Sequence, residues 1–225
     1  MAEDIKSTEV SSFDKLQTWF EKNQKPFNIG LIGLLAVVLG SVYYFQMYIP
    51  EQQQQAEGEI YKAQEFFAID SFTIALNGKI GGPIGDDEII GFLEIAEKYG
   101  ASPSGNLAKY YAGVCYLRMG EFQSAIDWLA KYKPKDKMTG TTTYGAMGDA
   151  YLELGDNAKA LENYKKAAAY YENNFTSPFY LFKAGQVSEL SGNNAEALAF
   201  YQQIETKYPK SQHGTQIDQH IARVK

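Results

Sequence analysis

A short segment recurs three times in the C-terminal half of the chain. Its copies read YYAGVCYLRMGEFQSAIDWL, YGAMGDAYLELGDNAKALENY and LFKAGQVSELSGNNAEALAFY. When the copies are aligned, Gly113, Gly148 and Gly185 fall at the same position, with spacings of 35 and 37 residues. A near-fixed period of this length indicates a stack of small units, because one unit alone cannot bury its apolar face. The repeat therefore favours a helical solenoid.

Each copy is predicted to be two helices joined by a tight turn. A glycine inside a helix is about 1 kcal/mol less favourable than alanine, so we expect close helix packing to compensate at Gly113, Gly148 and Gly185. Seven residues after each of them comes a second glycine, suited to a left-handed C-cap: Gly120, Gly155 and Gly192. The second helix then has an alanine followed four residues later by a large side chain: Ala125 with Leu129, Ala160 with Tyr164 and Ala197 with Tyr201.

These matched positions, over about residues 106–209, resemble the tetratricopeptide repeat, whose period is about 34 residues. Upstream, residues 51–76 and 87–98 are predicted to be two helices joined by a glycine-rich loop, which would form a degenerate leading pair. Downstream, residues 216–224 are predicted to form an amphipathic helix, with Ile217, Ile221 and Val224 at helical spacing. Such a helix would cap the last apolar face of the stack.

Residues 26–50 contain no charged side chain, and a helix needs roughly 20 apolar residues to cross a bilayer. Tyr43, Tyr44 and Tyr48 lie at the C-terminal end of this stretch, where amphipathic rings favour the headgroup region. A cleavable signal peptide would need a short basic start and small residues before the cleavage site. Here the polar lead is longer, and tyrosines take the place of small residues. We therefore expect a retained signal anchor.

The lysines around this stretch predict its orientation. Lys15, Lys22 and Lys25 precede it, whereas only Lys62 follows within a comparable distance, so the positive-inside rule places the N-terminus in the cytoplasm. The expected organisation is a cytoplasmic segment at 1–25, a transmembrane anchor at 26–50 and a repeat domain outside the cytoplasm at 51–225. The expected fold class is all-α, with a single N-terminal transmembrane helix followed by a tetratricopeptide α-solenoid of three clear repeats.

The sequence offers little for catalysis or metal binding. A net charge of −6 leaves no broad basic surface for nucleic acid. Cys115 is the only cysteine, and in its apolar helical stretch we expect a buried, inert thiol. His213 and His220 lie seven residues apart without a cysteine or carboxylate at ligand spacing. We expect no catalytic, cofactor or metal site and no small-molecule substrate. An enzyme or sensor whose polar site forms only on folding is the alternative.

Four further segments carry patterns that are also found at functional sites. Residues 78–85 are rich in glycine, but they follow a predicted helix and lack the Gly-Lys-Ser/Thr ending of a phosphate loop, so we expect a connector. Asp86, Asp87 and Glu88 precede an apolar run and are predicted to cap a helix rather than bind an ion. Residues 131–137, KYKPKDK, are predicted to be a solvated loop, with contact to an anionic headgroup or acidic partner as the alternative. Asn174 begins a glycosylation sequon, relevant only in a secretory host.

A solenoid acts through its surface, and the first helices of stacked repeats line a concave groove. The repeat register predicts the residues of this partner groove: Leu107, Tyr110, Val114, Leu117, Arg118, Asp149, Leu152, Glu153, Phe179, Phe182, Gln186 and Glu189. The alternative for some of these side chains is packing within or between repeats. The basic side chains with which some tetratricopeptide domains clamp a C-terminal carboxylate are largely missing, so that mode is not expected.

The order of anchor and repeats, with the stretch GNLAKYYAGVCYLRMGEFQSAIDWL and the ending YPKSQHGTQIDQHIARVK, resembles the YfgM-like family of bacterial inner-membrane proteins, in its Bacteroidota-type form. The resemblance implies a non-catalytic ancillary subunit of the Sec translocon with its repeats in the periplasm. Its partners would be translocon subunits, exported chains or periplasmic chaperones, in protein transport or membrane insertion. A scaffold for an outer-membrane or secretion complex unrelated to Sec is the alternative.

Overall fold

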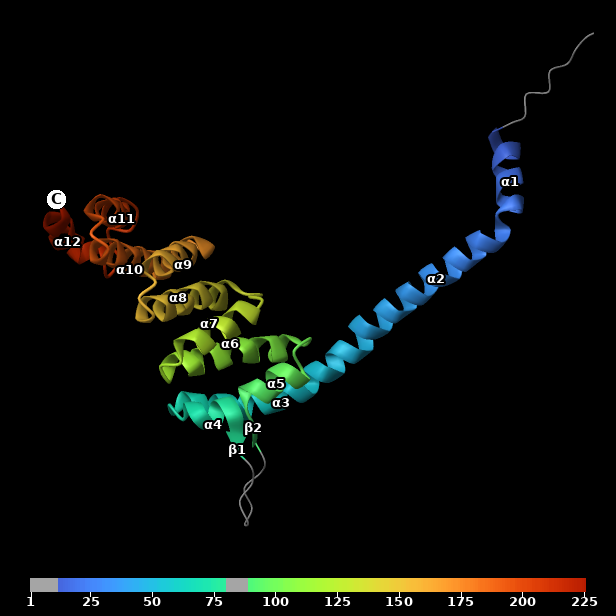
Figure 1. The fold of residues 1–225 in the computed structure, drawn as a ribbon, viewed down its shortest axis with the longest axis horizontal. Coiled ribbons are helices and arrows are strands. Elements are labelled where there is room, and N and C mark those ends of the chain that lie inside the picture. The colour runs from blue at the N-terminus through green and yellow to red at the C-terminus, as the bar shows by residue number, and fades with distance from the viewer. Residues whose placement is uncertain (1–11, 80–88) are drawn as a thin grey trace, which may run out of the picture. The chain divides into compact units, whose positions relative to one another are not determined.

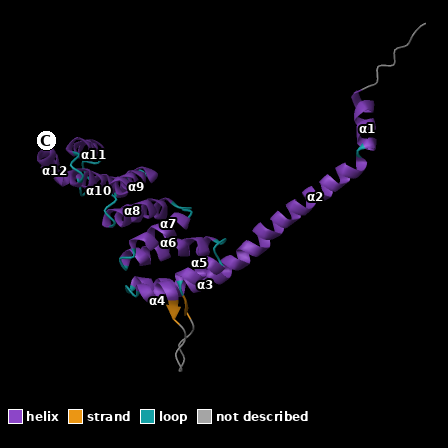
Figure 2. Cartoon of the chain, in the orientation of Figure 1, coloured by secondary structure: helices purple, strands orange, loops and turns teal. Residues whose placement is uncertain are grey.

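The computed structural model describes residues 12–79 and 89–225. The chain divides into two compact units, residues 1–51 and residues 52–225. Helices make up nearly all of the regular structure in the described residues, and one short hairpin holds the strands (Figure 2). The fold is therefore all-α, as predicted.

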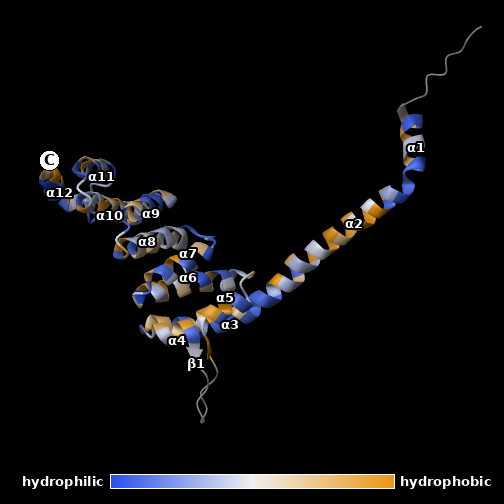
Figure 3. Cartoon of the chain, viewed as in Figure 1, coloured by the Kyte–Doolittle hydropathy of each residue, from blue (hydrophilic) through white to orange (hydrophobic). Residues whose placement is uncertain are grey.

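The first unit contains α1 (Ser12–Lys22), α2 (Gln24–Tyr43) and the π-helix η1 (Tyr44–Tyr48). Hydrophobic side chains recur along α2 (Figure 3), and none of its residues is buried. The helical residues Gln24–Ala68 contain an 18-residue window with a mean hydropathy of 1.8, none of it buried. By length and composition, this is a helix that could cross a membrane.

The second unit is the repeat array, drawn in Figure 1 from α3 to α12. Its helices and strands are α3 (Ile49–Ala68, which begins just before the unit boundary), α4 (Phe72–Asn77), β1 (Gly78–Lys79), β2 (Ile89–Ile90), α5 (Phe92–Lys98), α6 (Pro103–Arg118), α7 (Phe122–Lys131), α8 (Lys137–Glu153), α9 (Asn157–Tyr170), α10 (Thr176–Leu190), α11 (Asn194–Lys207), the 3-10 helix η2 (Gly214–Gln216) and α12 (Ile217–Val224). The predicted pairs are α6 with α7, α8 with α9, and α10 with α11, and each pair packs together.

The turn inside each pair has the predicted left-handed glycine. Gly120, Gly155 and Gly192 have φ values of 80°, 77° and 74°. At the first turn, the Gly120 N–H donates to the Leu117 carbonyl at 3.1 Å, and the Glu121 N–H donates to the Tyr116 carbonyl at 2.9 Å. These are the two bonds of a Schellman motif, which satisfies carbonyls left unpaired at a helix end. The prediction of glycine C-caps is confirmed.

The prediction of one helix over residues 51–76 is wrong. α3 ends at Ala68, and Asp70 adopts a left-handed φ of 59° before α4 begins at Phe72. Hydrogen bonds from Asp70 N–H to Phe67 O and from Ser71 N–H to Phe66 O follow the same pattern as the repeat turns. Aspartate is one of the few non-glycine residues that tolerates this conformation. The turn brings the Phe67 ring within 5.5 Å of the Phe72 ring, so ring packing offsets its conformational cost.

The predicted helix at residues 87–98 begins later than expected. α5 starts at Phe92, and Ile89–Ile90 form a strand antiparallel to Gly78–Lys79. β-branched isoleucines favour strands, and the backbone passes so close that a Cβ on Gly91 would lie 2.3 Å from Gly78 N. The proposed capping residues Asp86, Asp87 and Glu88, and most of the glycine-rich loop at 78–85, lie outside the described residues.

The C-terminal helix has the predicted capping role. Ile217, Ile221 and Val224 of α12 are all buried and join the core cluster formed by α9, α10 and α11. A second cluster occupies α3 to α6, and a small third one lies between α7 and α8. The core is thus a series of clusters along the stack, as expected when each repeat packs on its neighbours.

Candidate functional site

A groove with a volume of ≈ 700 Å³ lies on the first helices of the three pairs. Most of its lining comes from α6, α8 and α10, and α7, α9 and the Gly120 turn complete it. The lining residues are Leu117, Arg118, Gly120, Phe122, Asp149, Leu152, Glu153, Tyr164, Lys183, Gln186, Val187 and Leu190.

The apolar part of the groove changes from buried to exposed across α10. Val187 is 2% exposed and belongs to the core, whereas Leu190 is 69% exposed. Leu117 and Leu152 are half-buried and face the groove from α6 and α8. An exposed leucine beside half-buried ones provides apolar surface that a bound chain could cover.

The charged part of the groove is organised around Asp149. Its Oδ1 accepts a hydrogen bond from the Tyr164 hydroxyl at 2.6 Å and another from the Lys183 ammonium at 2.6 Å. The ammonium also lies 5.4 Å from the centre of the Tyr164 ring. Burial, reinforced by the bond donated to Asp149, raises the pKa of the Tyr164 hydroxyl well above its usual value. The phenol therefore stays protonated and acts as a fixed donor that orients the carboxylate.

Six of the predicted groove residues line this groove: Leu117, Arg118, Asp149, Leu152, Glu153 and Gln186. Arg118 and Glu153 are exposed. The Arg118 guanidinium lies 3.5 Å from the Asp70 carboxylate, with both side chains more than half exposed. The guanidinium also lies 5.2 Å from the centre of the Phe72 ring. Ion pairs this exposed contribute little to stability, so an acidic group of a bound chain can replace Asp70 as the partner of Arg118.

Three other predicted residues of α6 lie outside the groove lining. Leu107 packs against the core cluster of α3 to α6. Tyr110 donates a hydrogen bond from its hydroxyl to Thr142 Oγ1 at 3.1 Å, which ties α6 to α8. Val114 is half-buried on α6, outside the groove lining. Leu107 and Tyr110 thus take part in packing between helices rather than in the groove.

The remaining three predicted residues lie on α10. Phe179 lines a separate hollow of ≈ 400 Å³. The Phe182 ring centre lies 4.5 Å from the His213 ring and 4.7 Å from the His220 ring. Glu189 accepts hydrogen bonds from Arg223 of α12 at 2.9 and 2.8 Å. Phe182 and Glu189 therefore hold the C-terminal cap.

Five side chains in the groove were not predicted from the sequence: Phe122, Tyr164, Lys183, Val187 and Leu190. A signal for Leu190 was present, because it stands five residues after Gly185, as Arg118 and Glu153 stand after their glycines. No such register marks Lys183, since the equivalent positions hold Tyr111 and Ala146. Its place in the groove depends on its partner Asp149.

Among the described residues, no three His, Cys, Asp or Glu side chains are grouped closely enough to hold a metal. His213 and His220 both pack on Phe182, and burial lowers the pKa of each ring. Cys115 is fully buried, and burial raises the pKa of its thiol to about 12. This environment keeps the thiol unreactive, as the sequence predicted.

The tetratricopeptide repeat family matches residues 92–137 and 146–211. These residues contain the helix pairs, glycine turns and groove described above. The chain is therefore a tetratricopeptide-repeat protein, and domains of this type are typically non-catalytic scaffolds for protein–protein interaction. No curated protein matches the sequence.

Proposed function

We propose that this chain is a single-pass membrane scaffold whose repeat groove binds other proteins, and that it serves as an ancillary subunit of the bacterial Sec translocon. The groove on α6, α8 and α10 is the observation that carries the proposal, because it combines exposed Leu190 with charged side chains of both signs. Such a surface suits a protein segment that has both apolar and charged residues.

The membrane part of the proposal is supported by α2. None of the residues of this apolar helix is buried in the protein. Exposure of its side chains to water is unfavourable, whereas exposure to lipid is favourable. We place the anchor at residues 26–50 of a bacterial inner membrane. The lysine asymmetry then leaves residues 1–25 in the cytoplasm and residues 51–225 in the periplasm.

The occupant of the groove that we propose is an exported chain or a periplasmic chaperone. Arg118 can pair with an acidic residue of the occupant and Glu153 with a basic one, whereas Lys183 and Asp149 already pair with each other. The apolar rim at Leu190 would bind a hydrophobic side chain. Balanced charge disfavours selection for a strongly acidic or basic ligand. The translocon assignment itself rests on the likeness of the whole architecture to the YfgM-like proteins.

The test is affinity purification of the tagged full-length protein from membranes in mild detergent, with mass spectrometry. Leu190→Glu places a charge on the groove rim. Leu154→Glu is the matched control, because Leu154 is 48% exposed and lies outside the groove lining. An anchor-only chain of residues 1–50 separates contacts made in the membrane from contacts made by the repeats.

Translocon subunits should be recovered with the full chain and with Leu154→Glu, and groove-dependent partners should be lost with Leu190→Glu. Recovery of a different envelope complex without translocon subunits would favour the alternative, a scaffold for outer-membrane or secretion assembly. Equal recovery by both leucine variants would show that the groove is not the binding surface.

A further inference from the structure

Five lysines lie outside the groove lining, on α6, at the end of α7, in the loop that follows and at the start of α8. They are here called the basic edge: Lys109, Lys131, Lys133, Lys135 and Lys137. Within residues 12–79 and 89–225, none of the five is in an ion pair. The chain as a whole has a net charge of −6. A positive patch of this kind on an acidic protein favours an anionic ligand.

The one acidic residue in this loop is already engaged. Asp136 Oδ1 accepts hydrogen bonds from the Met138 N–H at 2.9 Å and the Thr139 N–H at 2.8 Å, which cap α8. The hydrogen bond from the Thr139 hydroxyl, together with those from backbone N–H groups, holds the pKa of Asp136 below its usual value. The carboxylate is therefore a helix cap rather than a partner for the lysines.

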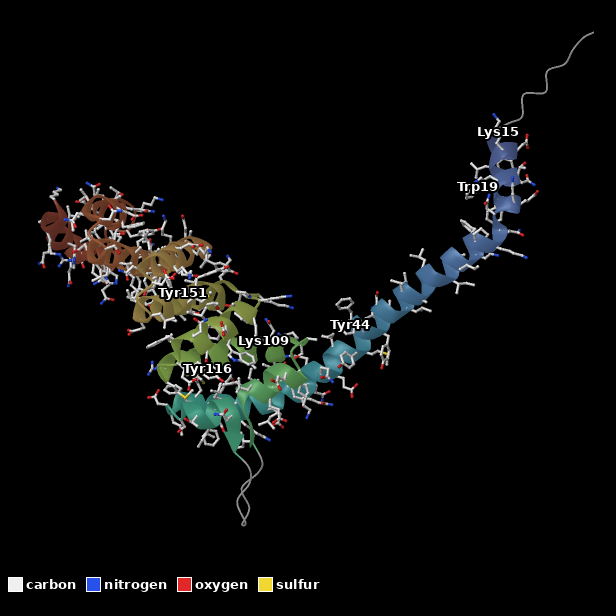
Figure 4. All side chains as sticks on the ribbon, in the orientation of Figure 1. Lys15, Trp19, Tyr44, Lys109, Tyr116 and Tyr151 are labelled. Carbon is white, nitrogen blue, oxygen red and sulfur yellow. The ribbon has the colours of Figure 1, made fainter. Side chains whose placement is uncertain are left out.

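The loop is held in place by α6. The Asn106 side-chain amide donates to the Lys133 carbonyl at 2.7 Å and accepts from the Lys133 N–H at 3.1 Å. Lys109, labelled on α6 in Figure 4, donates from its ammonium to the Gly100 carbonyl at 3.0 Å. Burial, together with the charges of Lys133 and Lys131, lowers the pKa of Lys109. Lys109, Lys131 and Lys133 are thus close enough for their positive charges to interact.

Aromatic and apolar side chains accompany the lysines. The Lys131 ammonium lies 4.0 Å from the centre of the Trp128 ring, and the Lys137 ammonium lies 4.3 Å from that of Tyr171. Beside Lys137, Met138 is 62% exposed, and it shares a hollow with Phe175, which is 84% exposed. Lysines mixed with amphipathic rings and exposed apolar groups are typical of a membrane interface.

The position of the basic edge along α6 favours a membrane surface as its anionic ligand. Gln53 accepts from the Ser104 N–H and donates to the Ser104 hydroxyl, both at 2.8 Å. Ser104 and Asn106 belong to the first turn of α6, so the residue bonded to Gln53 and the residue that holds Lys133 are neighbours. Gln53 follows the proposed anchor by three residues in the sequence. The basic edge is therefore connected, through Asn106, Ser104 and Gln53, to the first residues of the repeat domain after the anchor.

We propose that the basic edge binds the anionic phospholipid headgroups of the membrane that holds the anchor. The inference rests on the proposed membrane anchor, but not on the translocon or on the groove. Lysine ammoniums would pair with headgroup phosphates, and Phe175 and Met138 would reach the boundary with the acyl chains. Such contacts would hold the repeat array against the bilayer.

The test uses the full chain in lipid nanodiscs, one set of phosphatidylcholine alone and one containing phosphatidylglycerol. The readout is hydrogen exchange of the amides in residues 131–138. One variant carries K131Q, K133Q, K135Q and K137Q. The control carries K159Q, K165Q, K166Q and K225Q, which remove the same charge from α9 and the C-terminus. Circular dichroism checks that both variants are folded.

In the phosphatidylglycerol discs, exchange should slow about fivefold or more relative to the neutral discs, since each lysine near an anionic surface strengthens binding by about that factor. The effect should persist in the control, vanish in the basic-edge variant and vanish in 1 M salt. Equal exchange in both lipids would overturn the proposal. Protection that appears in neutral discs when inorganic phosphate is added would also overturn it, because the ligand would then be a free anion. Protection that appears only when an acidic protein is added would overturn it as well. Failure of the chain to enter nanodiscs at all would instead contradict the anchor.

Discussion

The ring of Tyr164 in α9 packs on Gly148 in α8 so closely that a Cβ at position 148 would lie 2.6 Å from two of the ring carbons. The first repeat has the same relationship, with a Cβ on Gly113 falling 2.6 Å from Leu129 Cγ. In the third repeat Tyr201 packs on Gly185. The glycine of the first helix and the large side chain of the second are therefore one structural device, repeated three times.

Gly148→Ala should destabilise the protein. The added methyl group must displace a fully buried ring, which costs about 1 to 3 kcal/mol, whereas the gain in helix propensity is about 1 kcal/mol. We expect the midpoint of thermal unfolding of the full chain in detergent to fall by a few degrees. The control is Gly58→Ala in α3, where no atom lies within 4 Å of the new Cβ. That variant should be neutral or more stable. If both variants melted alike, tight packing at Gly148 would be refuted.

Tyr164→Phe removes the hydroxyl that donates to Asp149 but keeps the ring on Gly148. A hydrogen bond to a charged acceptor contributes about 1.5 to 3 kcal/mol, and Asp149 keeps its bond to Lys183, so we expect a loss near the lower end of that range. The comparison variant is Tyr61→Phe, whose side chain is 63% exposed. Thermal unfolding should distinguish the two. An unchanged midpoint for Tyr164→Phe would mean that water replaces the hydroxyl without loss.

The repeat architecture was predictable because its signals are stereochemical. Only glycine readily adopts the φ near 80° found at Gly120, and a glycine facing a large side chain is required wherever two helices approach this closely. Because three copies of the repeat have glycines at matching positions, the equivalent positions of their helices could be aligned from the sequence. The apolar spacing of Ile217, Ile221 and Val224 likewise predicted the buried face of α12.

The leading region was less predictable because tertiary contacts decide it. Asp70 carries no strong turn signal in sequence, yet it takes the place that glycine has in the other turns. The turn at Asp70 is favoured by the Phe67 ring, which packs against the Phe72 ring. The centre of the Phe67 ring also lies 5.2 Å from the centre of the Tyr111 ring on α6. A contact across so many residues leaves no local pattern, so residues 51–76 looked like one continuous helix.

The groove was predictable only in part, for a similar reason. The register indicates which side of a first helix faces the groove, but not which side chains turn away to find partners. Glu189 binds Arg223 of the capping helix, and Phe182 supports two histidine rings. Both partners come from beyond the repeats, so repeat periodicity alone did not indicate them.

Cys115 should resist thiol reagents until the protein unfolds. It is fully buried in the cluster of α3 to α6, and with a pKa of about 12 only about one thiol in ten thousand is ionised at pH 8. It is also the sole cysteine, so every labelling event reports this site. We expect labelling of the native chain to be slower by orders of magnitude than labelling in denaturant. Comparable rates in the two conditions would show that this cluster opens readily.

The bond between Glu189 and Arg223 should make the docking of α12 sensitive to acid. The hydrogen bonds from Arg223 hold the pKa of Glu189 below its usual value, whereas in the unfolded chain that pKa is about 4.3. A depressed carboxyl pKa contributes stability that is present above about pH 4.3 and is lost as pH falls through the folded pKa. The protection of the α12 amides from hydrogen exchange, taken relative to the intrinsic exchange rate at each pH, should therefore fall below about pH 4 in the native sequence. In Glu189→Gln this acid-dependent step should disappear, and its persistence there would assign the effect to another group.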